Sequence, residues 1–150
     1  MIRVDTRFLG VLECPEESVV SFPAGLPPFT DQEFVVIAKE NSPFFFLQSV
    51  STAGLCFIML PVHAADPDYR LKLEPHDAES LGLACESPEL GGDLAGFTLI
   101  TIPEQGPMTA NLAAPVLINT AKNVGVQAVR SDSTYSHTHP IDGGGEVARC

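Results

Sequence analysis

Pro107-Met-Thr-Ala-Asn-Leu-Ala-Ala-Pro-Val-Leu-Ile-Asn-Thr120 joins a polar loop to an apolar run of the kind that forms a buried strand. The amide of Asn111 lies between the two, and no charged residue interrupts them. A segment without an acid, a base or a cation supplies nothing for proton transfer or phosphate binding. It therefore predicts a strand that packs in a core, entered through a loop that presents an amide.

Short apolar runs on both sides of this segment are rich in β-branched and aromatic residues. Strands are expected at residues 8–12, 18–22, 34–38, 44–48, 55–60, 69–73, 97–102, 116–119 and 126–129. Turn residues at 41–43 predict a hairpin between the third and fourth of these runs, and the fifth is expected to pair back on the fourth. Glycine and proline recur at spacings of about ten residues, which is typical of small sandwiches and barrels.

Two patterns predict which side chains are buried. Residues 69–73 alternate apolar and basic side chains, as expected for a strand with one buried and one exposed face. In a strand at 44–48, Phe45 points opposite to Phe44 and Phe46, because successive side chains alternate between the two faces. One face of that strand is therefore expected in the core, and the other covered or exposed.

Helix signals are few. The best covers residues 76–81, where Asp77 favours the first turn and Gly82 offers a C-terminal stop. Shorter turns are expected at 30–33 and at Asn123-Val-Gly125.

A single domain is expected, because no repeat or linker divides the chain and 150 residues can form one core. The prediction is one mainly β domain over residues 1–141. Residues 142–150, with Gly143-Gly-Gly145, lack core residues and are expected to be a disordered tail.

The charge is strongly acidic, with 8 Lys and Arg against 19 Asp and Glu and a net charge of −11. This excess of carboxylates repels nucleic-acid phosphates and anionic membrane surfaces, so neither is an expected partner. It suits a basic protein partner, because complementary fields speed encounter. The alternative is that the acidity only keeps the domain soluble.

The amino terminus carries charges at Arg3, Asp5 and Arg7, where a signal peptide needs an apolar core, and the longest apolar run, residues 55–62, is too short to cross a bilayer. A cytoplasmic location is therefore expected. The cysteines are widely spaced without a C-x-x-C pair, which indicates free thiols in a reducing compartment: Cys14, Cys56, Cys85 and Cys150.

Candidate catalytic and metal-binding groups each have a simpler structural interpretation. Cys56 lies in an apolar run that is expected to raise the pKa of its thiol, so it does not resemble an activated nucleophile. His137 and His139 could share a face of a strand, but no second close pair of ligands supports a metal site. Asp66 and Asp68 could act as an acid–base pair, although a turn between strands explains the same residues more simply.

Several blocks of sequence together resemble the flagellar assembly factor FliW family. They are Thr6-Arg-Phe-Leu-Gly10, Val20-Ser-Phe-Pro-Ala-Gly-Leu-Pro-Pro-Phe29, Pro43-Phe-Phe-Phe-Leu-Gln-Ser49, Pro67-Asp-Tyr69, Met108-Thr-Ala-Asn-Leu112, Ala114-Pro-Val-Leu-Ile-Asn119 and Tyr135-Ser-His-Thr-His-Pro-Ile141. The order and spacing of the blocks cover residues 1–141. The chain departs from the family pattern at Phe45-Phe46, where a pair ending in Trp is common, at Pro61-Val-His-Ala-Ala65, and at Thr138, where Arg is common.

The resemblance implies a small, mainly antiparallel β-barrel-like fold with one or two short helices. It also implies a non-catalytic cytoplasmic protein that has no cofactor, metal or small-molecule substrate. Such a protein binds flagellin and binds the RNA-binding translational repressor CsrA, which then no longer represses the flagellin transcript. Plentiful flagellin occupies the factor and frees the repressor.

Within this interpretation, seven residues are predicted at partner-binding positions: Phe44, Phe46, Gln48, Asp66, Asp68, Tyr69 and Asn111. The first three would form a docking strand, and the next three a polar rim. Asn111 would either tie a loop to the backbone or touch a partner. Gly25 and Pro27 are expected to set a rigid turn.

Two other functions remain compatible with the residues. The Thr109-Ala-Asn111 loop could contact the ring of a flavin in a small oxidoreductase barrel, but the phosphate of a flavin needs cations, and none occurs between Lys72 and Lys122. A protein-interaction domain unrelated to flagella shares every feature and differs only in its partner.

Overall fold

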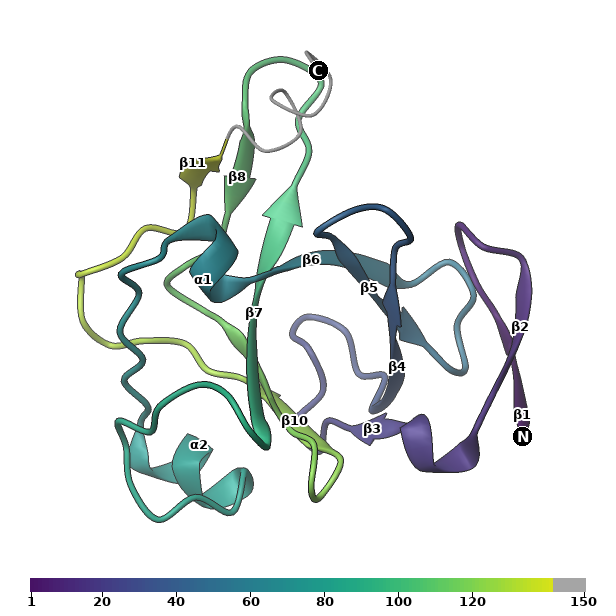
Figure 1. The fold of residues 1–150 in the computed structure, drawn as a ribbon, viewed down its shortest axis with the longest axis horizontal. Helices are drawn as coiled ribbons and strands as arrows, with labels where there is room; N and C mark the ends of the chain where they lie inside the picture. Colours follow the sequence, from purple (N-terminus) through teal and green to yellow (C-terminus); the bar gives the residue numbers. More distant parts are fainter. Residues whose placement is uncertain (142–150) are drawn as a thin grey trace.

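The computed structural model describes residues 1–141, in which seven strands close into a barrel (Figure 1). Around the barrel the order is β7-β6-β5-β4-β3-β10-β9, and β9 pairs back on β7. The strands are β3 (Val20–Ser21), β4 (Glu33–Ala38), β5 (Phe45–Ser49), β6 (Cys56–Pro61), β7 (Leu94–Thr101), β9 (Val116–Asn119) and β10 (Val124–Gln127). Neighbours pair antiparallel except β3 and β10, which are parallel. The predicted antiparallel barrel-like fold is confirmed.

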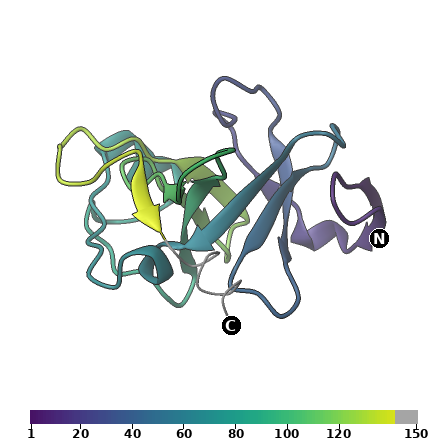
Figure 2. The same ribbon diagram turned by 90° about the horizontal axis from the view of Figure 1, so that it is seen from above.

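Two further pieces of sheet stand outside the closed barrel. β8 (Met108–Ala110) pairs antiparallel with the C-terminal end of β7, and β11 (His139–Ile141) pairs with β8. β1 (Ile2–Asp5) and β2 (Val11–Cys14) form a separate hairpin, followed by the 3₁₀ helix η1 (Glu16–Ser18). In both views this hairpin lies at one end of the molecule and residues 62–83 lie at the other (Figure 2).

The barrel interior is filled by side chains that alternate along its strands. The buried members of this core are Val20, Phe22, Leu26, Phe34, Leu47, Met59, Phe97, Val116 and Ile118. The loop after β3 curls across the barrel and contributes Leu26, which has almost no exposed surface (Figure 1). Gly25 turns this loop with a φ of +68°, and its N–H donates to the Phe22 carbonyl at 2.8 Å, as the predicted turn requires.

A second core lies between the outer face of the barrel and residues 62–83. Those residues form α1 (Val62–Ala65), an extended segment and α2 (Pro75–Ser80). On β9, Leu117 packs into this outer core while Val116 and Ile118 point into the barrel, so the strand is buried on both faces. This double burial explains why the run at 116–119 is almost wholly apolar.

The predicted strand at 69–73 is wrong, although its alternation is right. Tyr69, Leu71 and Leu73 are buried, while Arg70 and Lys72 are exposed. The segment belongs to no strand of the described sheets because it lies across the outer face of the barrel. Side-chain packing alone therefore produces the alternation.

The predicted strands near the amino terminus need correction. Residues 8–10 turn the chain between β1 and β2, where Gly10 has a φ of +69° and Thr6 Oγ1 accepts the Leu9 N–H at 2.8 Å. Only Val20 and Ser21 of the run at 18–22 are in a strand. The local hydrogen bonds of Thr6 compete with strand pairing at this point.

The hairpin between β9 and β10 turns earlier than predicted. The chain reverses over residues 120–123, with Asn123 in the left-handed region at a φ of +51°, and β10 begins at Val124. Asn119 Oδ1 accepts the N–H of Ala121 at 3.1 Å, which stabilises this turn. The strand predicted at 126–129 is therefore shifted by two residues.

The helix predicted at 76–81 is confirmed as α2, and Gly82 ends it with a φ of +72°. Residues 30–33 form no helical turn. Among residues 1–141, every helix is too short to cross a membrane. The predicted tail at 142–150 lies outside the described residues.

Candidate partner-binding surface

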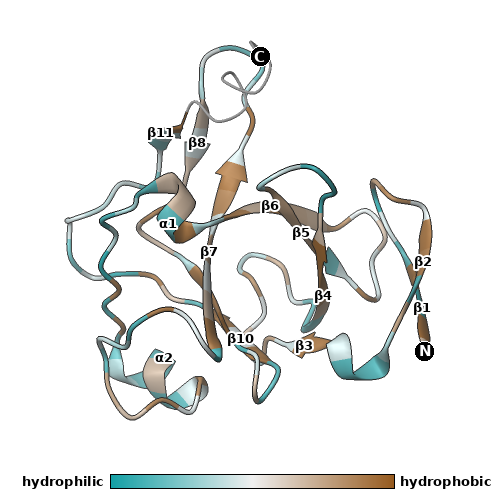
Figure 3. Cartoon of the chain, viewed as in Figure 1, coloured by the Kyte–Doolittle hydropathy of each residue, from teal (hydrophilic) through white to brown (hydrophobic). Residues whose placement is uncertain are grey.

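A mostly apolar groove of about 360 Å³ opens between the N-terminal hairpin and the far end of β7. The barrel supplies Phe46 from β5 and Ile58 from β6, which are direct partners in the sheet register. The remaining lining residues come from loops or from β8 and are Phe8, Leu9, Lys39, Phe44, Ile102 and Met108. In Figure 3 the hydrophobic colour lies on β2 and at the end of β7, while one arm of the hairpin carries a hydrophilic stretch.

The alternation predicted for Phe44-Phe-Phe46 is confirmed. Phe45 packs inside the barrel against Phe97, with ring centroids 5.2 Å apart. Phe46 points outward, and its ring stacks on Phe8 at 5.4 Å with an interplanar angle of 26°. Phe44 and Phe46 therefore share the groove, as their predicted docking role requires.

Gln48 lies on the same face of β5 but has no exposed surface. Its Oε1 accepts the backbone N–H of Arg7 at 3.0 Å, and its Nε2 donates to the carbonyls of Ser49 and Ala53 at 3.1 Å. A fully buried side chain cannot touch a partner in this conformation, so its assignment as a contact residue is corrected. Gln48 instead fastens the loop that carries Phe8 to the barrel.

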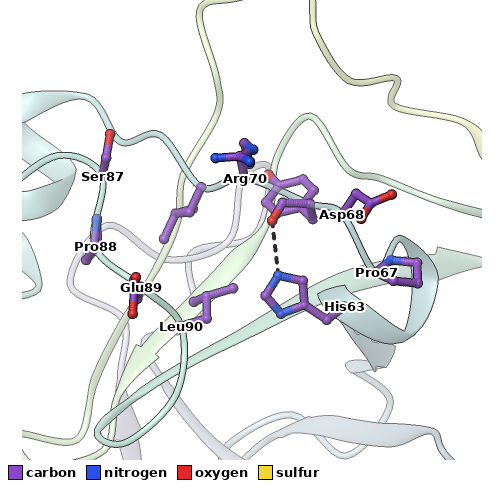
Figure 4. Close-up of a pocket in the computed structure, with 10 residues that line it drawn as sticks. His63, Pro67, Asp68, Arg70, Ser87, Pro88, Glu89 and Leu90 are labelled. Atoms are coloured by element: carbon purple, nitrogen blue, oxygen red, sulfur yellow. Dashed lines mark hydrogen bonds between the residues drawn. The ribbon is translucent and has the colours of Figure 1, made fainter.

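A second, polar cleft of about 720 Å³ lies beside α1 (Figure 4). It is lined by side chains of both charges, including Asp68, Arg70 and Glu89. Asp66 Oδ1 accepts the N–H of Asp68 at 3.0 Å, which is the hydrogen bond of a turn. The predicted turn is confirmed, but it follows α1 and does not join two strands. The Asp68 side chain is exposed at the cleft.

Tyr69 is buried beneath this cleft. Its hydroxyl donates to the Leu112 carbonyl at 2.9 Å, and its ring centroid lies 4.3 Å from that of Tyr135. Burial raises the pKa of the Tyr69 hydroxyl above its ordinary value. Tyr69 thus joins distant parts of the chain and presents little surface to a partner. The carbonyl of Tyr69 lies 3.0 Å from Nε2 of His63 (Figure 4).

Arg130 organises this region, although nothing in the sequence singles it out. Its side chain is only 5% exposed and donates two hydrogen bonds of 2.9 Å to Asp132. It also donates to the Arg70 carbonyl at 2.7 Å and lies 4.8 Å above the Tyr135 ring. A single arginine after an apolar strand gives no local sign of these distant partners.

Asp132 predicts a specific pH dependence. Hydrogen bonds from Arg130 lower the pKa of its carboxyl to about 2 in the folded protein, against about 3.9 in an unfolded chain. Because the folded pKa is depressed, Asp132 contributes stability above about pH 4, and this is lost as the pH falls towards 2. Asp132→Asn should therefore flatten the dependence of the unfolding free energy on pH in this window, measured by urea titration. An unchanged slope would contradict the ion pair.

Asn111 does not make the predicted side-chain tie. Its backbone N–H donates to the Leu99 carbonyl at 3.0 Å, but its Oδ1 is buried without a hydrogen-bond partner among residues 1–141. The thiol of Cys56 has its pKa raised to about 11 by burial, as expected. Within residues 1–141, no three His, Cys, Asp or Glu side chains gather as metal ligands would.

The family model for the FliW protein matches residues 3–141, which is nearly all of the described chain. The chain belongs to the FliW family. Flagellar assembly factors FliW from Geobacillus sp. (strain WCH70) and Syntrophomonas wolfei are 31% and 33% identical to it over 142 and 143 residues. Each alignment covers 93% of this chain, and 95% and 88% of the respective relatives.

A crystal structure of the flagellar assembly factor FliW superposes with a TM-score of 0.82 at 31% identity. The match covers 92% of this chain and 95% of the other. The blocks that resemble FliW have structural tasks here: Phe22 and Leu26 fill the barrel, and Tyr135 packs on Tyr69. FliW membership therefore accounts for the fold.

Proposed function

We propose that this protein is a non-catalytic flagellar assembly factor that acts in the cytoplasm by binding other proteins. Its partners are flagellin and the RNA-binding repressor CsrA. While it holds the repressor, the flagellin transcript is translated. When unassembled flagellin accumulates, it occupies the factor, the repressor is released, and flagellin synthesis falls.

The observation that carries this proposal is an apolar groove on an acidic barrel of the FliW family. Phe8, at the edge of the groove, is 50% exposed. Leu9 and Ile102, which also line the groove, are exposed as well. Gathered apolar surface of this kind is typical of protein-docking sites. The relatives named above are flagellar assembly factors, which fits a partner from that process.

The net charge of −11 supports an encounter with the repressor. A surface that binds RNA must attract phosphates and is therefore basic. Opposite fields raise the rate of association and orient the two proteins before contact. Phe44 and Asp68 remain proposed contact residues, because each keeps exposed surface at the groove or the cleft. Phe46 forms the floor of the groove, with only 7% of its surface exposed.

The test is binding between purified proteins of the same organism. The factor should co-elute separately with flagellin and with the CsrA-type repressor in gel filtration, and calorimetry should give dissociation constants below about 1 μM. Adding flagellin to the complex with the repressor should release the repressor. Absence of binding to both proteins at micromolar concentrations would refute the proposal.

Salt separates electrostatic steering from binding itself. The association rate with the repressor should fall by about tenfold when salt rises from low to physiological concentration, because the attracting fields are screened. A rate that does not change with salt would remove steering from the mechanism. The association of flagellin, measured in parallel by stopped flow, provides the comparison.

A further inference from the structure

The apolar groove is built from two kinds of surface. Its floor consists of Phe46 and Ile58, which are held in register by the pairing of β5 with β6. One wall is the β1–β2 loop, where Gln48 fixes the backbone of Arg7 and Phe8 stacks on Phe46. Because both surfaces are anchored, little ordering is required before a partner binds.

The opposite wall is Ile102 and Met108, at the far end of β7 and in β8. Ile102 is 59% exposed, and it is one of three strongly exposed large apolar side chains at this groove, with Phe8 and Leu9. The exposed apolar surface therefore faces the groove from both sides. The groove volume of about 360 Å³ is sufficient for bulky apolar side chains.

The charge of the groove differs from that of the whole protein. The described lining contains Lys39 and no carboxylate, although carboxylates outnumber cations by 19 to 8 in the sequence. A second cation, Arg7, lies 5.2 Å above the Phe8 ring. Glu40 follows Lys39 in the sequence and Glu104 lies two residues after Ile102, but neither glutamate lines the groove. The local charge thus complements a carboxylate on the partner.

We infer that this groove docks a short protein segment that carries bulky apolar side chains and at least one carboxylate. The inference deepens the proposed function, on which it rests for the protein nature of the occupant. The basic surface of an RNA-binding repressor is unfavourable beside Lys39 and Arg7 and is attracted to the acidic remainder.

The test uses a displayed library of random 15-residue peptides, selected on the folded protein and counter-selected on Ile102→Ser. Enriched peptides should contain Phe, Leu, Ile or Met together with more Asp and Glu than Lys and Arg. Their affinities are then measured by calorimetry. Failure to enrich peptides that depend on Ile102, or enrichment of basic peptides, would overturn the inference.

Three variants define the expected affinities. Ile102→Ser should weaken the selected peptide by at least about tenfold, as expected for the loss of an anchoring side chain. Lys39→Glu should weaken it by about fivefold or more by replacing an attractive charge with a repulsive one. Val129→Ser is the matched control, because Val129 is 58% exposed and lies outside the groove, and it should leave the affinity unchanged.

Two further outcomes are decisive. Loss of affinity in Val129→Ser equal to that in Ile102→Ser would show that binding does not depend on the groove. Self-association of the free protein that Ile102→Ser abolishes would make a second copy the occupant and also overturn the inference. The peptide measurements contain neither flagellin nor the repressor, so their failure is distinct from failure of the proposed function.

Discussion

Arg130→Met is expected to lower the free energy of unfolding by roughly 2–4 kcal/mol, measured by urea denaturation. The guanidinium bonds to Asp132 and to the Arg70 carbonyl, and it covers the Tyr135 ring. Methionine preserves part of the packing but donates no hydrogen bond. The Arg70 carbonyl and the Tyr69 hydroxyl then lose a donor.

Arg70→Met is the matched control for this substitution. The Arg70 side chain is exposed, and its role in the cluster depends on its backbone carbonyl, which the substitution leaves in place. The unfolding free energy should therefore change by less than about 0.5 kcal/mol. Arg130→Lys should be intermediate, because lysine keeps the charge but cannot form the paired hydrogen bonds to Asp132. Equal effects of Arg130→Met and Arg70→Met would contradict the buried role of Arg130.

The sequence predicts the central strands well because their signals are local. The apolar runs that became β4, β5, β6 and β9 each contain enough β-branched and aromatic residues to identify a strand within a few positions. The closure of β7 on β9 is different, since it depends on which distant strands meet. No pattern within either run specifies that pairing.

The wrongly predicted strands also result from contacts that the local sequence pattern does not contain. Residues 69–73 have the period of a strand, but their neighbours are the side chains on the outside of the barrel. The turn of Phe8-Leu-Gly10 depends on hydrogen bonds of Thr6 that compete with a strand pattern. Local periodicity identifies which side chains are buried and cannot tell whether the backbone enters a sheet.

The groove could be predicted only in part. Phe44 and Phe46 were identifiable because the strand pattern at 44–48 places them on one face. Phe8, Ile102 and Met108 reach the same groove from distant positions in the chain, so no motif connects them. Gln48 has the correct face and the wrong role, because its burial depends on the loop that folds over it.

Gly125→Ala is expected to lower the free energy of unfolding by about 1–3 kcal/mol, because the barrel has no space for a side chain there. A Cβ on Gly125 would lie 2.5 Å from Cζ and 2.6 Å from Cε2 of Phe22. Phe22 has no exposed surface and packs edge-on against Phe34 at 5.4 Å, so its ring has little freedom to move. Urea denaturation, with thermal unfolding as a second probe, measures the loss.

Gly54→Ala is the control, since a Cβ there meets nothing within 4 Å and the residue does not have a positive φ. It should be neutral or slightly stabilising, because alanine restricts the unfolded chain. The decisive variant combines Gly125→Ala with Phe22→Leu, which removes the ring atoms that would collide with the new Cβ. The double variant should be more stable than the sum of the two single losses predicts, by about 1 kcal/mol or more. Simple additivity would show that Gly125 is required for a reason other than contact with Phe22.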